Sequence, residues 1–407
     1  MPVTVTSSNW KEKNITNLTL GAYERFNYGD LLFPIVLDSI YSRLRGPHDP
    51  RQLHHCTVGK GDMTAEGGVK TQSAQQAFKT DQQSLIVGGG EILGAGWFSM
   101  WSSLQPDWVD PVVRLTRKFV PRRARERVGR RFLGGYWQYP FVPDLATVSK
   151  LGFNAIGATH SSILATSEQA RLWAIVGESS LATVRDETSA EIAASFGLDL
   201  EVVPDSAAAL LDLPRFSSYR SLAPVGGGQA TNSVIVQMSK SWAASCTQET
   251  IDALSEIGRQ CDGLTLLAVG LAGAHSDQSG LEDISKRLSC RSRLVVPRDL
   301  DEVVSYISRA SVVIATSLHV NITAMASGVK IVPLAGIKKL DSYIATWGFD
   351  SETPVIGVRI LDAFNSEDVS SGRSARIARA QSLSTAAQAA TARVLESTFD
   401  LHSQGAG

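Results

Sequence analysis

The chain has 407 residues, which favours two domains over one, and its 43% hydrophobic and 19% charged residues are typical of a globular protein. The formal net charge of −1 gives no reason to expect a nucleic-acid partner. No apolar run is long enough to cross a bilayer and the polar N-terminus lacks a signal-peptide core, so we expect a cytoplasmic protein. Four widely spaced cysteines without a Cys-x-x-Cys pair predict free thiols: Cys56, Cys246, Cys261 and Cys290.

Strand-like and helix-like segments alternate along almost the whole chain, which indicates an α/β protein with parallel sheets. In the first half, strands are predicted at residues 17–21, 84–87, 154–157, 181–184 and 200–203, and helices at 31–44 and 189–196. In the second half, strands are predicted at 233–237, 264–269, 293–296, 312–315 and 330–334, and a helix at 367–399 in the Ala- and Ser-rich tail.

A change in composition around residues 214–232 divides the chain. Pro224 and the run Gly226-Gly227-Gly228 are typical of an interdomain linker. Two doubly wound, Rossmann-like lobes would place a ligand cleft between them, at the carboxyl ends of the strands. We therefore expect an N-terminal lobe at 1–215, a linker at 216–232, a C-terminal lobe at 233–365 and a helical tail at 366–407.

The most informative stretch is 315–329, where His319 stands between the predicted strand 312–315 and a following helix. Free backbone N–H groups and the positive end of the helix dipole favour an anion at such a junction. A histidine there can hold a phosphate or carboxylate and can also transfer a proton. A hydrogen-bonded structural histidine is the alternative.

Lys339 occupies the next strand-to-helix junction, after the strand 331–334. Parallel neighbouring strands would bring both junctions to the same edge of the sheet, so His319 and Lys339 could hold one anionic ligand together. Lys338 is the adjacent alternative, and we expect one of the two lysines to face solvent.

Two polar positions in the first half could serve either structure or function. Asp30 follows Asn27 in a tight turn before the helix 31–44, and a helix N-cap is favoured over a catalytic base. Gly29 beside it would let a substrate approach the backbone.

Arg185 follows the strand 181–184. Two interpretations of Arg185 are possible: a salt-bridged helix start, or an anion ligand that faces the cleft.

Three further segments leave alternatives open. Residues 88–90, Gly-Gly-Gly, follow a strand without a dinucleotide or P-loop spacing, so either a plain turn or close approach to a ligand fits. His275 and Asp277 follow the strand 264–269 and could act as a general base, bind sugar hydroxyls or lie in a solvated loop. Residues 54–56, His-His-Cys, lack further ligands at metal-binding spacing, and we interpret them as a polar loop.

A basic stretch at 114–131 is flanked by aromatic residues, within a segment that spans about 95–143. A solvated basic helix is the simple interpretation. Contact with an anionic bilayer or a lipid-diphosphate acceptor is the functional one, and it predicts peripheral association with the inner face of the membrane. Nucleic acid is disfavoured by the neutral total charge.

The stretch 315–329 resembles the C-terminal signature of the polysaccharide pyruvyl transferase family, Ser-Arg-Leu-His-Gly or Thr-Ser-Leu-His-Gly and then a helix ending in Gly-Val-Pro. This chain departs from it at Ser317, where many members carry arginine, at Val320, where glycine is usual, and at Lys330, where proline is usual. Five other segments resemble family motifs in the right order: Asn27-Tyr28-Gly29-Asp30, Val87-Gly88-Gly89-Gly90, Val184-Arg185-Asp186-Glu187-Thr188-Ser189, Val203-Pro204-Asp205 and Lys339-Leu340-Asp341.

The resemblance implies the two-lobed GT-B-like architecture and transfer of a pyruvyl group from phosphoenolpyruvate to two hydroxyls of a sugar, on a glycan or lipid-linked oligosaccharide. It implies no cofactor or metal beyond the donor substrate. It also implies that His319 is a phosphate ligand and general acid, that Lys339 and Arg185 bind anionic groups, and that Asp30 or Asp277 orients the acceptor. The other residues expected to bind substrate are Asn27, Gly29, Gly88, Gly89, Gly90, His275, Ser317 and Asn321.

Two alternatives use the same fold. A glycosyltransferase would bind a nucleotide sugar in the same cleft, often with an acidic residue on the ribose, but no acid follows His319 until Asp341. A catalytically silent glycan-binding protein would release no phosphate and would tolerate loss of His319.

Overall fold

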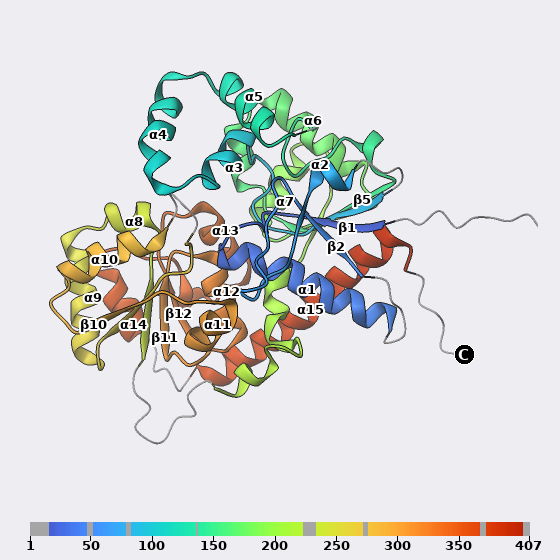
Figure 1. The fold of residues 1–407 in the computed structure, drawn as a ribbon. Helices are drawn as coiled ribbons and strands as arrows, with labels where there is room; N and C mark the ends of the chain where they lie inside the picture. The colour runs from blue at the N-terminus through green and yellow to red at the C-terminus, as the bar shows by residue number, and fades with distance from the viewer. Residues whose placement is uncertain are drawn as a thin grey trace, which may run out of the picture.

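The computed structural model describes residues 16–46, 52–78, 83–135, 137–222, 233–271, 276–366 and 372–401. Within these ranges the chain forms two parallel β-sheets with helices packed around each, one sheet from the first half of the chain and one from the second (Figure 1). This confirms the predicted α/β fold with two doubly wound, GT-B-like lobes.

The first sheet has seven strands in the order β3-β2-β1-β4-β5-β6-β7, and all its neighbours run parallel. The chain therefore reverses its direction of winding between β1 and β4, and such a switch point opens a crevice at the carboxyl ends of the strands. The strands are β1 Thr16–Leu20, β2 His54–Thr57, β3 Gln72–Ser73, β4 Gln83–Val87, β5 Lys150–Ile156, β6 Leu181–Val184 and β7 Glu201–Val202.

The helices of this first half include an arm that leaves the sheet after β4 and returns before β5. We call α4, α5 and the turn before them, residues 107–132, the α4–α5 arm. The α-helices are α1 Tyr28–Arg45, α2 Ala74–Ala77, α3 Trp97–Ser103, α4 Asp110–Phe119, α5 Arg122–Phe132, α6 Thr166–Gly177 and α7 Glu187–Ala194. The 3₁₀ helices are η1 Asp107–Val109, η2 Leu145–Thr147, η3 Thr159–Ile163, η4 Ser206–Asp212 and η5 Ser217–Leu222.

The second sheet has five parallel strands in the order β10-β9-β8-β11-β12, with its switch point between β8 and β11. Its strands are β8 Val234–Gln237, β9 Leu264–Leu267, β10 Ser292–Val295, β11 Val312–Ala315 and β12 Lys330–Pro333. Its helices are α8 Lys240–Ala244, α9 Gln248–Gln260, α10 Asp277–Arg287, α11 Leu300–Ser308, α12 Leu318–Ala326, α13 Lys338–Trp347, η7 Asp350–Glu352 and α14 Arg359–Asn365.

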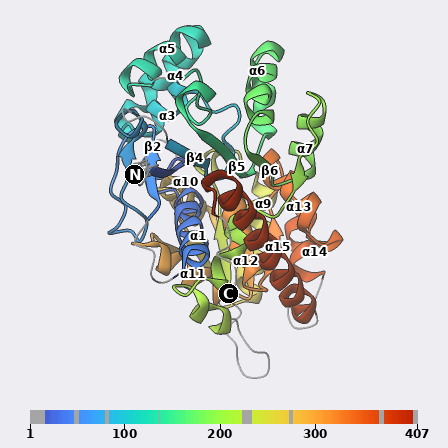
Figure 2. The ribbon, with the colours of Figure 1, turned by 90° about the vertical axis from the view of Figure 1, so that its right-hand side faces the viewer.

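The last helix, α15 (Arg373–Phe399), confirms the predicted helical tail, of which residues 367–371 lie outside the described ranges. It crosses back to the first lobe and packs against β4, β5 and β6 (Figure 2). At its end the ring of Phe399 packs edge-on against that of Tyr41, with 5.9 Å between the ring centroids. The helix therefore joins the two lobes.

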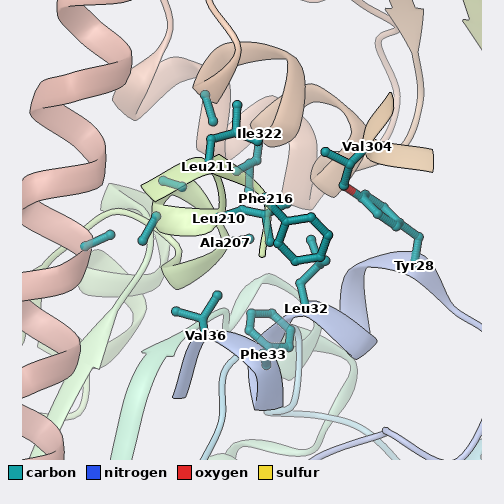
Figure 3. Close-up of a cluster of buried hydrophobic side chains, with 14 of the residues drawn as sticks. Tyr28, Leu32, Phe33, Val36, Ala207, Leu210, Leu211, Phe216, Val304 and Ile322 are labelled. Carbon is teal, nitrogen blue, oxygen red and sulfur yellow. The ribbon is translucent and has the colours of Figure 1, made fainter. Parts of the chain in front are cut away.

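One hydrophobic core spans both lobes. Figure 3 shows α1 side chains such as Leu32 and Phe33 facing Leu210 of η4 and Ile322 of α12. Beside this core, the Tyr28 hydroxyl pairs with the Thr323 hydroxyl at 2.7 Å. Burial of this apolar surface between the lobes fixes their relative position and therefore the geometry of the cleft above it.

Two sequence interpretations in the first lobe are wrong. Residues 54–56 are not a polar loop: they belong to β2, and His55 is buried with hydrogen bonds to Thr19 and Asp38 at 2.8 and 3.0 Å. Asp30 is not the N-cap of α1, because the helix begins at Tyr28 and Asn27 occupies that position. A strand of four residues gives little hydrophobic periodicity, which explains the first error.

Of the predicted linker, residues 217–222 form η5, and residues 223–232 lie outside the described ranges.

Candidate active site

A cavity of about 440 Å³ lies between the lobes, where both switch points meet. Its walls come from the segments that follow β1, β4 and β6 in one sheet and β8, β9, β11 and β12 in the other. Nine of the predicted site residues line it: Asn27, Asp30, Gly89, Gly90, Arg185, Asp277, Ser317, His319 and Lys339.

His319 lies in the first turn of α12, directly after the buried strand β11. Its Nε2 lies 3.6 Å from a carboxylate oxygen of Asp205, which comes from the other lobe. The Phe33 ring packs edge-on against the imidazole, with 5.3 Å between centroids. On the remaining side lies Gly29 of α1, where an added Cβ would come within 1.8 Å of Nδ1. The ring is thus held on three sides.

Asp205 is fully buried at the start of η4, where its other oxygen accepts the Ala207 N–H at 3.0 Å. Burial would raise its pKa, but contact with His319 and the nearby Arg185 guanidinium lowers the pKa below its usual range. The carboxylate is therefore ionised beside His319, and it can orient the imidazole and balance a positive charge on it. In the sequence, Asp205 was noted only as part of Val203-Pro204-Asp205, which resembles a family motif.

Arg185 is buried and surrounded by carboxylates. Its Nη2 donates to Glu91 at 2.6 Å and its Nη1 to Asp205 at 3.4 Å, while Asp186 lies 3.6 Å from Nε. Burial opposes ionisation of Glu91, yet Arg185 holds the pKa of that carboxyl below its usual range. The guanidinium charge is thus already balanced by carboxylates. Of the two interpretations of Arg185, the salt-bridged helix start is therefore the one that the structure supports, although the Arg185 side chain also lines the cavity.

Lys339 is a cavity cation without a direct carboxylate partner among the described residues, although the charges of Asp30, Glu91 and Asp205 act on it from a distance. It is half-buried and makes no hydrogen bond or ion pair with any residue that the structure describes, whereas Lys338 is exposed. Burial, and then the Arg185 charge, lower the pKa of the Lys339 ammonium group. Because β11 and β12 are parallel neighbours, Lys339 and His319 occupy the same wall, as the topology predicted.

Backbone N–H groups at the start of α12 also face this region. Ser317 caps the helix by accepting the Val320 N–H at 3.4 Å. In the described part of the chain, the N–H groups of Leu318 and His319 have no acceptor. With the positive end of the α12 dipole and Lys339 nearby, this edge of the cavity favours an anion.

Asp277 and Gln237 form a buried, hydrogen-bonded pair next to the start of α12. One oxygen of Asp277 accepts hydrogen bonds from Gln237 Nε2 and from the N–H groups of Val269 and Gly270, at 2.9 to 3.2 Å. The side-chain oxygen of Gln237, Oε1, in turn accepts the Ser317 N–H at 2.8 Å. Burial raises the pKa of Asp277 to about 6. Its hydrogen bonds make it a positioning residue.

The opposite wall is formed by Asp30 and the glycine loop. Asn27 donates to one oxygen of Asp30 at 2.7 Å, and the other oxygen lies 4.0 Å from where a Cβ on Gly90 would stand. Gly89 and Gly90 have φ values of 118° and 88°, which favour glycine. A substrate hydroxyl could therefore approach both Asp30 and this backbone.

The remaining predicted residues lie outside the cavity lining. Gly88 packs beneath the loop against the Tyr23 hydroxyl, and Gly29 acts only by contacting His319. Asn321 is buried, and its amide donates to the carbonyl groups of Ala315 and Ser317, so it secures the start of α12. His275 lies outside the described residues.

Three polar residues escaped the sequence prediction. Asp205 and Glu91 bind the buried Arg185. His160, an exposed residue of the 3₁₀ helix η3, also lines the cavity. Glu91 also accepts the His160 N–H at 2.8 Å. The position of Glu91 directly after the glycine loop was the one available signal, because the carboxyl ends of strands carry functional residues in this fold.

A second cavity of about 660 Å³ adjoins the first and shares Ala95 with it. Two glutamates, Glu126 and Glu168, lie among its lining residues. Five arginines outnumber them: Arg122, Arg123, Arg127, Arg130 and Arg171. Arg123 and Arg127 are exposed and have no ion-pair partner among the residues described. The excess of positive charge favours a phosphate group.

The described ranges contain no group of three or more His, Cys, Asp or Glu side chains placed to hold a metal ion. They also contain no helix with the length and apolar character needed to cross a bilayer.

Comparison with known proteins places this architecture in a family. No curated protein sequence matches the chain. Among solved structures, Staphylococcus aureus MnaA in a co-structure with UDP superposes with a TM-score of 0.55 at 9% identity, covering 96% of this chain and 98% of MnaA. The UDP-GlcNAc 2-epimerase of Neisseria meningitidis, bound to UDP-GlcNAc, gives 0.50 at 10% identity over 94% and 100%. These similarities show the shared fold.

The family model for polysaccharide pyruvyl transferase matches residues 15–336, which include β1, the glycine loop, Arg185, Asp205 and His319. The chain belongs to the polysaccharide pyruvyl transferase family.

Proposed function

We propose that this protein transfers a pyruvyl group from phosphoenolpyruvate to two hydroxyls of a sugar, forming a cyclic ketal and releasing phosphate. The observation that carries the proposal is the joint placement of His319, paired with Asp205, and the unpaired Lys339 in one interlobe cavity. Family membership supports the reaction class.

The donor would bind along the wall formed by α12 and α13. Its phosphate and carboxylate are both anionic, and they need cations and free N–H groups. Lys339 and the N–H groups of Leu318 and His319 offer these, whereas Arg185 is balanced by Glu91 and Asp205. These groups would supply the anion contacts in a chain that lacks the arginine which many family members carry at the position of Ser317.

The chemistry requires one proton donor and one departing phosphate. The first sugar hydroxyl attacks C2 and loses its proton, which balances the proton that is added to the methylene carbon as this becomes the methyl group. The C–O bond to phosphate then breaks, the second hydroxyl attacks C2 to close the ketal, and its proton leaves with the phosphate as hydrogen phosphate. His319, oriented by Asp205, would supply the first proton, and Lys339 would stabilise the departing phosphate.

The acceptor would enter from the side of Asp30 and the glycine loop. The free oxygen of Asp30 would orient a sugar hydroxyl, since its other oxygen is taken by Asn27. The arginine-lined cavity lies beyond Ala95, and we propose that it holds the phosphate groups linking a glycan to its carrier. The acceptor is therefore a carrier-linked glycan, and the scheme includes no cofactor beyond the donor substrate.

The decisive experiment is phosphate release from phosphoenolpyruvate by purified protein with a panel of sugars and diphosphate-linked glycans. Release should depend on an acceptor, vanish in His319→Ala and persist in the exposed control Lys338→Met. A matching mass increase of the acceptor would identify the ketal.

Two outcomes would overturn the proposal. No release, together with stabilisation of the protein by UDP but not by phosphoenolpyruvate, would favour a nucleotide-sugar glycosyltransferase. Glycan binding that is unchanged in His319→Ala, without any release, would favour a catalytically silent binding protein.

A further inference from the structure

Exposed apolar side chains are concentrated on the α4–α5 arm. Of the thirteen large hydrophobic residues that are exposed in the described structure, seven fall between residues 108 and 132. They are Trp108, Val112, Leu115, Phe119, Val120, Val128 and Phe132. Exposed apolar side chains that are concentrated in this way indicate an interaction site in a folded protein.

Four of these side chains form one stripe along α4 and the turn before it: Trp108, Val112, Leu115 and Phe119, which are 60 to 79% exposed. The last three lie on α4, where 3.6 residues per turn places them on one helix face. Trp108 lies in the 3₁₀ helix η1, directly before α4 and four residues before Val112. We call these four residues the α4 stripe.

The body of the protein lies on the other side of the helix. Val113 is buried, and Arg117 donates to the Ser102 hydroxyl of α3 at 3.3 Å. Both residues are on the face opposite the α4 stripe. Figure 1 shows α4 at the outer edge of the arm, away from the seven-stranded sheet. The stripe therefore faces outward.

The charge around the stripe is strongly positive. Residues 108–132 contain nine Lys and Arg residues against two acidic residues, although the whole chain has a net charge of −1. Lys118 Nζ lies 5.3 Å from the centroid of the Phe119 ring, so a cation borders the stripe itself. Arg131 is exposed on α5 beside the exposed ring of Phe132.

We propose that the α4–α5 arm docks on the surface of an anionic phospholipid bilayer. The α4 stripe would lie in the boundary between headgroups and acyl chains, with Trp108 at the interface, and the basic side chains would contact the anionic headgroups. A second copy of the chain is disfavoured as the occupant, because two arms of the same high positive charge repel each other. The proposal does not depend on pyruvyl transfer.

Docking would place the interlobe cavity next to the lipid surface. Ser99, Met100 and Ser103 of α3 line that cavity, and α3 packs closely against α5 of the arm. A membrane-bound arm would therefore hold the cavity within reach of a glycan that projects from a lipid carrier.

The test is sedimentation of the full-length protein with vesicles of phosphatidylglycerol and phosphatidylcholine, and with vesicles of phosphatidylcholine alone. We expect binding to the anionic vesicles and little to the neutral ones. The double variant Leu115→Ser/Phe119→Ser should weaken binding at least tenfold, since it removes two apolar side chains from the helix face that would be buried in the bilayer.

A matched control variant replaces two apolar side chains of similar exposure that lie outside the arm. Ile356 and Val358 are 57 and 59% exposed outside the arm, so Ile356→Ser/Val358→Ser should bind vesicles like the wild type. Lys118→Gln/Arg131→Gln should weaken binding and reduce its sensitivity to salt. Circular dichroism verifies that each variant is folded.

Three results would overturn the proposal: no binding to anionic vesicles, equal losses in the stripe and control variants, or a dimer in solution that the stripe variant abolishes. The last result would assign the stripe to a second copy. Phosphate release with a soluble acceptor should be unchanged in Leu115→Ser/Phe119→Ser, so a failure of membrane docking remains distinct from a failure of the proposed reaction.

Discussion

The imidazole of His319 lies directly over Gly29, so close that a Cβ on Gly29 would stand 1.8 Å from its Nδ1. The two residues belong to different lobes and to the first turns of two different helices, α1 and α12. His319 can therefore occupy its observed position only because residue 29 has no side chain.

Gly29→Ala should displace His319 and abolish most of the activity. Alanine is a better helix former than glycine, so we expect a folded protein, but the ring is confined by Phe33 and Asp205 and cannot simply rotate away. A displaced catalytic group of this kind costs about 100-fold in rate. Steady-state phosphate release checks this, with Gly59→Ala as the control, since a Cβ there meets Leu104 at an ordinary 3.5 Å.

Lys339→Met should raise the KM for phosphoenolpyruvate by about tenfold or more, because it removes a charge-assisted contact to the donor. Lys338→Met changes the neighbouring residue in the same way, but Lys338 is exposed and does not line the cavity. Its kinetic constants should match those of the wild type. Equal effects of the two substitutions would argue against a donor contact at Lys339.

Arg185→Met should lower the free energy of unfolding by about 3–5 kcal/mol, because it leaves Glu91, Asp186 and Asp205 buried without their cation. Urea denaturation measures the change. Arg393→Met, which breaks the exposed ion pair with Glu201, should cost less than about 1 kcal/mol. A small loss in the Arg185 variant would mean that the carboxylates take up protons or reach water instead.

Asp277 should make the protein less stable as the pH rises. Its pKa in the folded state is raised by burial to about 6, above that of an unfolded carboxyl. The resulting stabilisation is fully present below the unfolded pKa and is lost as the pH rises through about 6.

Asp277→Asn cannot ionise but can still accept hydrogen bonds from Gln237 and the backbone. Relative to the variant, we expect the wild type to lose about 1–3 kcal/mol between about pH 5 and pH 8. Chemical denaturation at both pH values tests this. Asp283→Asn, which alters an exposed carboxylate, is the control and should not change the slope. Parallel curves for all three proteins would contradict the expectation.

The double variant Arg123→Ala/Arg127→Ala should raise the KM for a diphosphate-linked acceptor by about tenfold and leave the KM for an uncharged sugar acceptor unchanged. Both arginines line the second cavity and lack carboxylate partners within the described ranges. Arg298→Ala removes an exposed arginine from the other lobe and serves as the control. An equal rise for both acceptors would indicate a general effect on the arm.

The sequence predicted the described strands except β2 and β3, because buried parallel strands appear as short β-branched runs between turns. The shared position of His319 and Lys339 followed from that topology, since each ends a neighbouring parallel strand. What could not be predicted was pairing between distant segments. The contact of Asp205 with His319 depends on how the two lobes pack, and that of Glu91 with Arg185 depends on how the loops after β4 and β6 fold over one edge of the first sheet; neither leaves a local periodicity in the chain.

Other differences have local causes. Asn27 occupies the N-cap position of α1, but its side-chain amide donates to Asp30 and makes no capping hydrogen bond, and the capping rule placed the N-cap at Asp30 instead. The basic stretch was evident from composition, but composition does not reveal which side of a helix faces the protein. The outward α4 stripe became apparent only once Val113 and Arg117 were placed against the body.

The core that runs from α1 through η4 to α12 (Figure 3) has a consequence for cooperativity. Neither sheet can lose its structure without exposing apolar side chains of the other lobe to water, so the two lobes should melt in a single transition although they have separate sheets. Since His319 and Asp205 come from opposite sides of that core, the catalytic pair forms only in molecules in which both lobes are folded together.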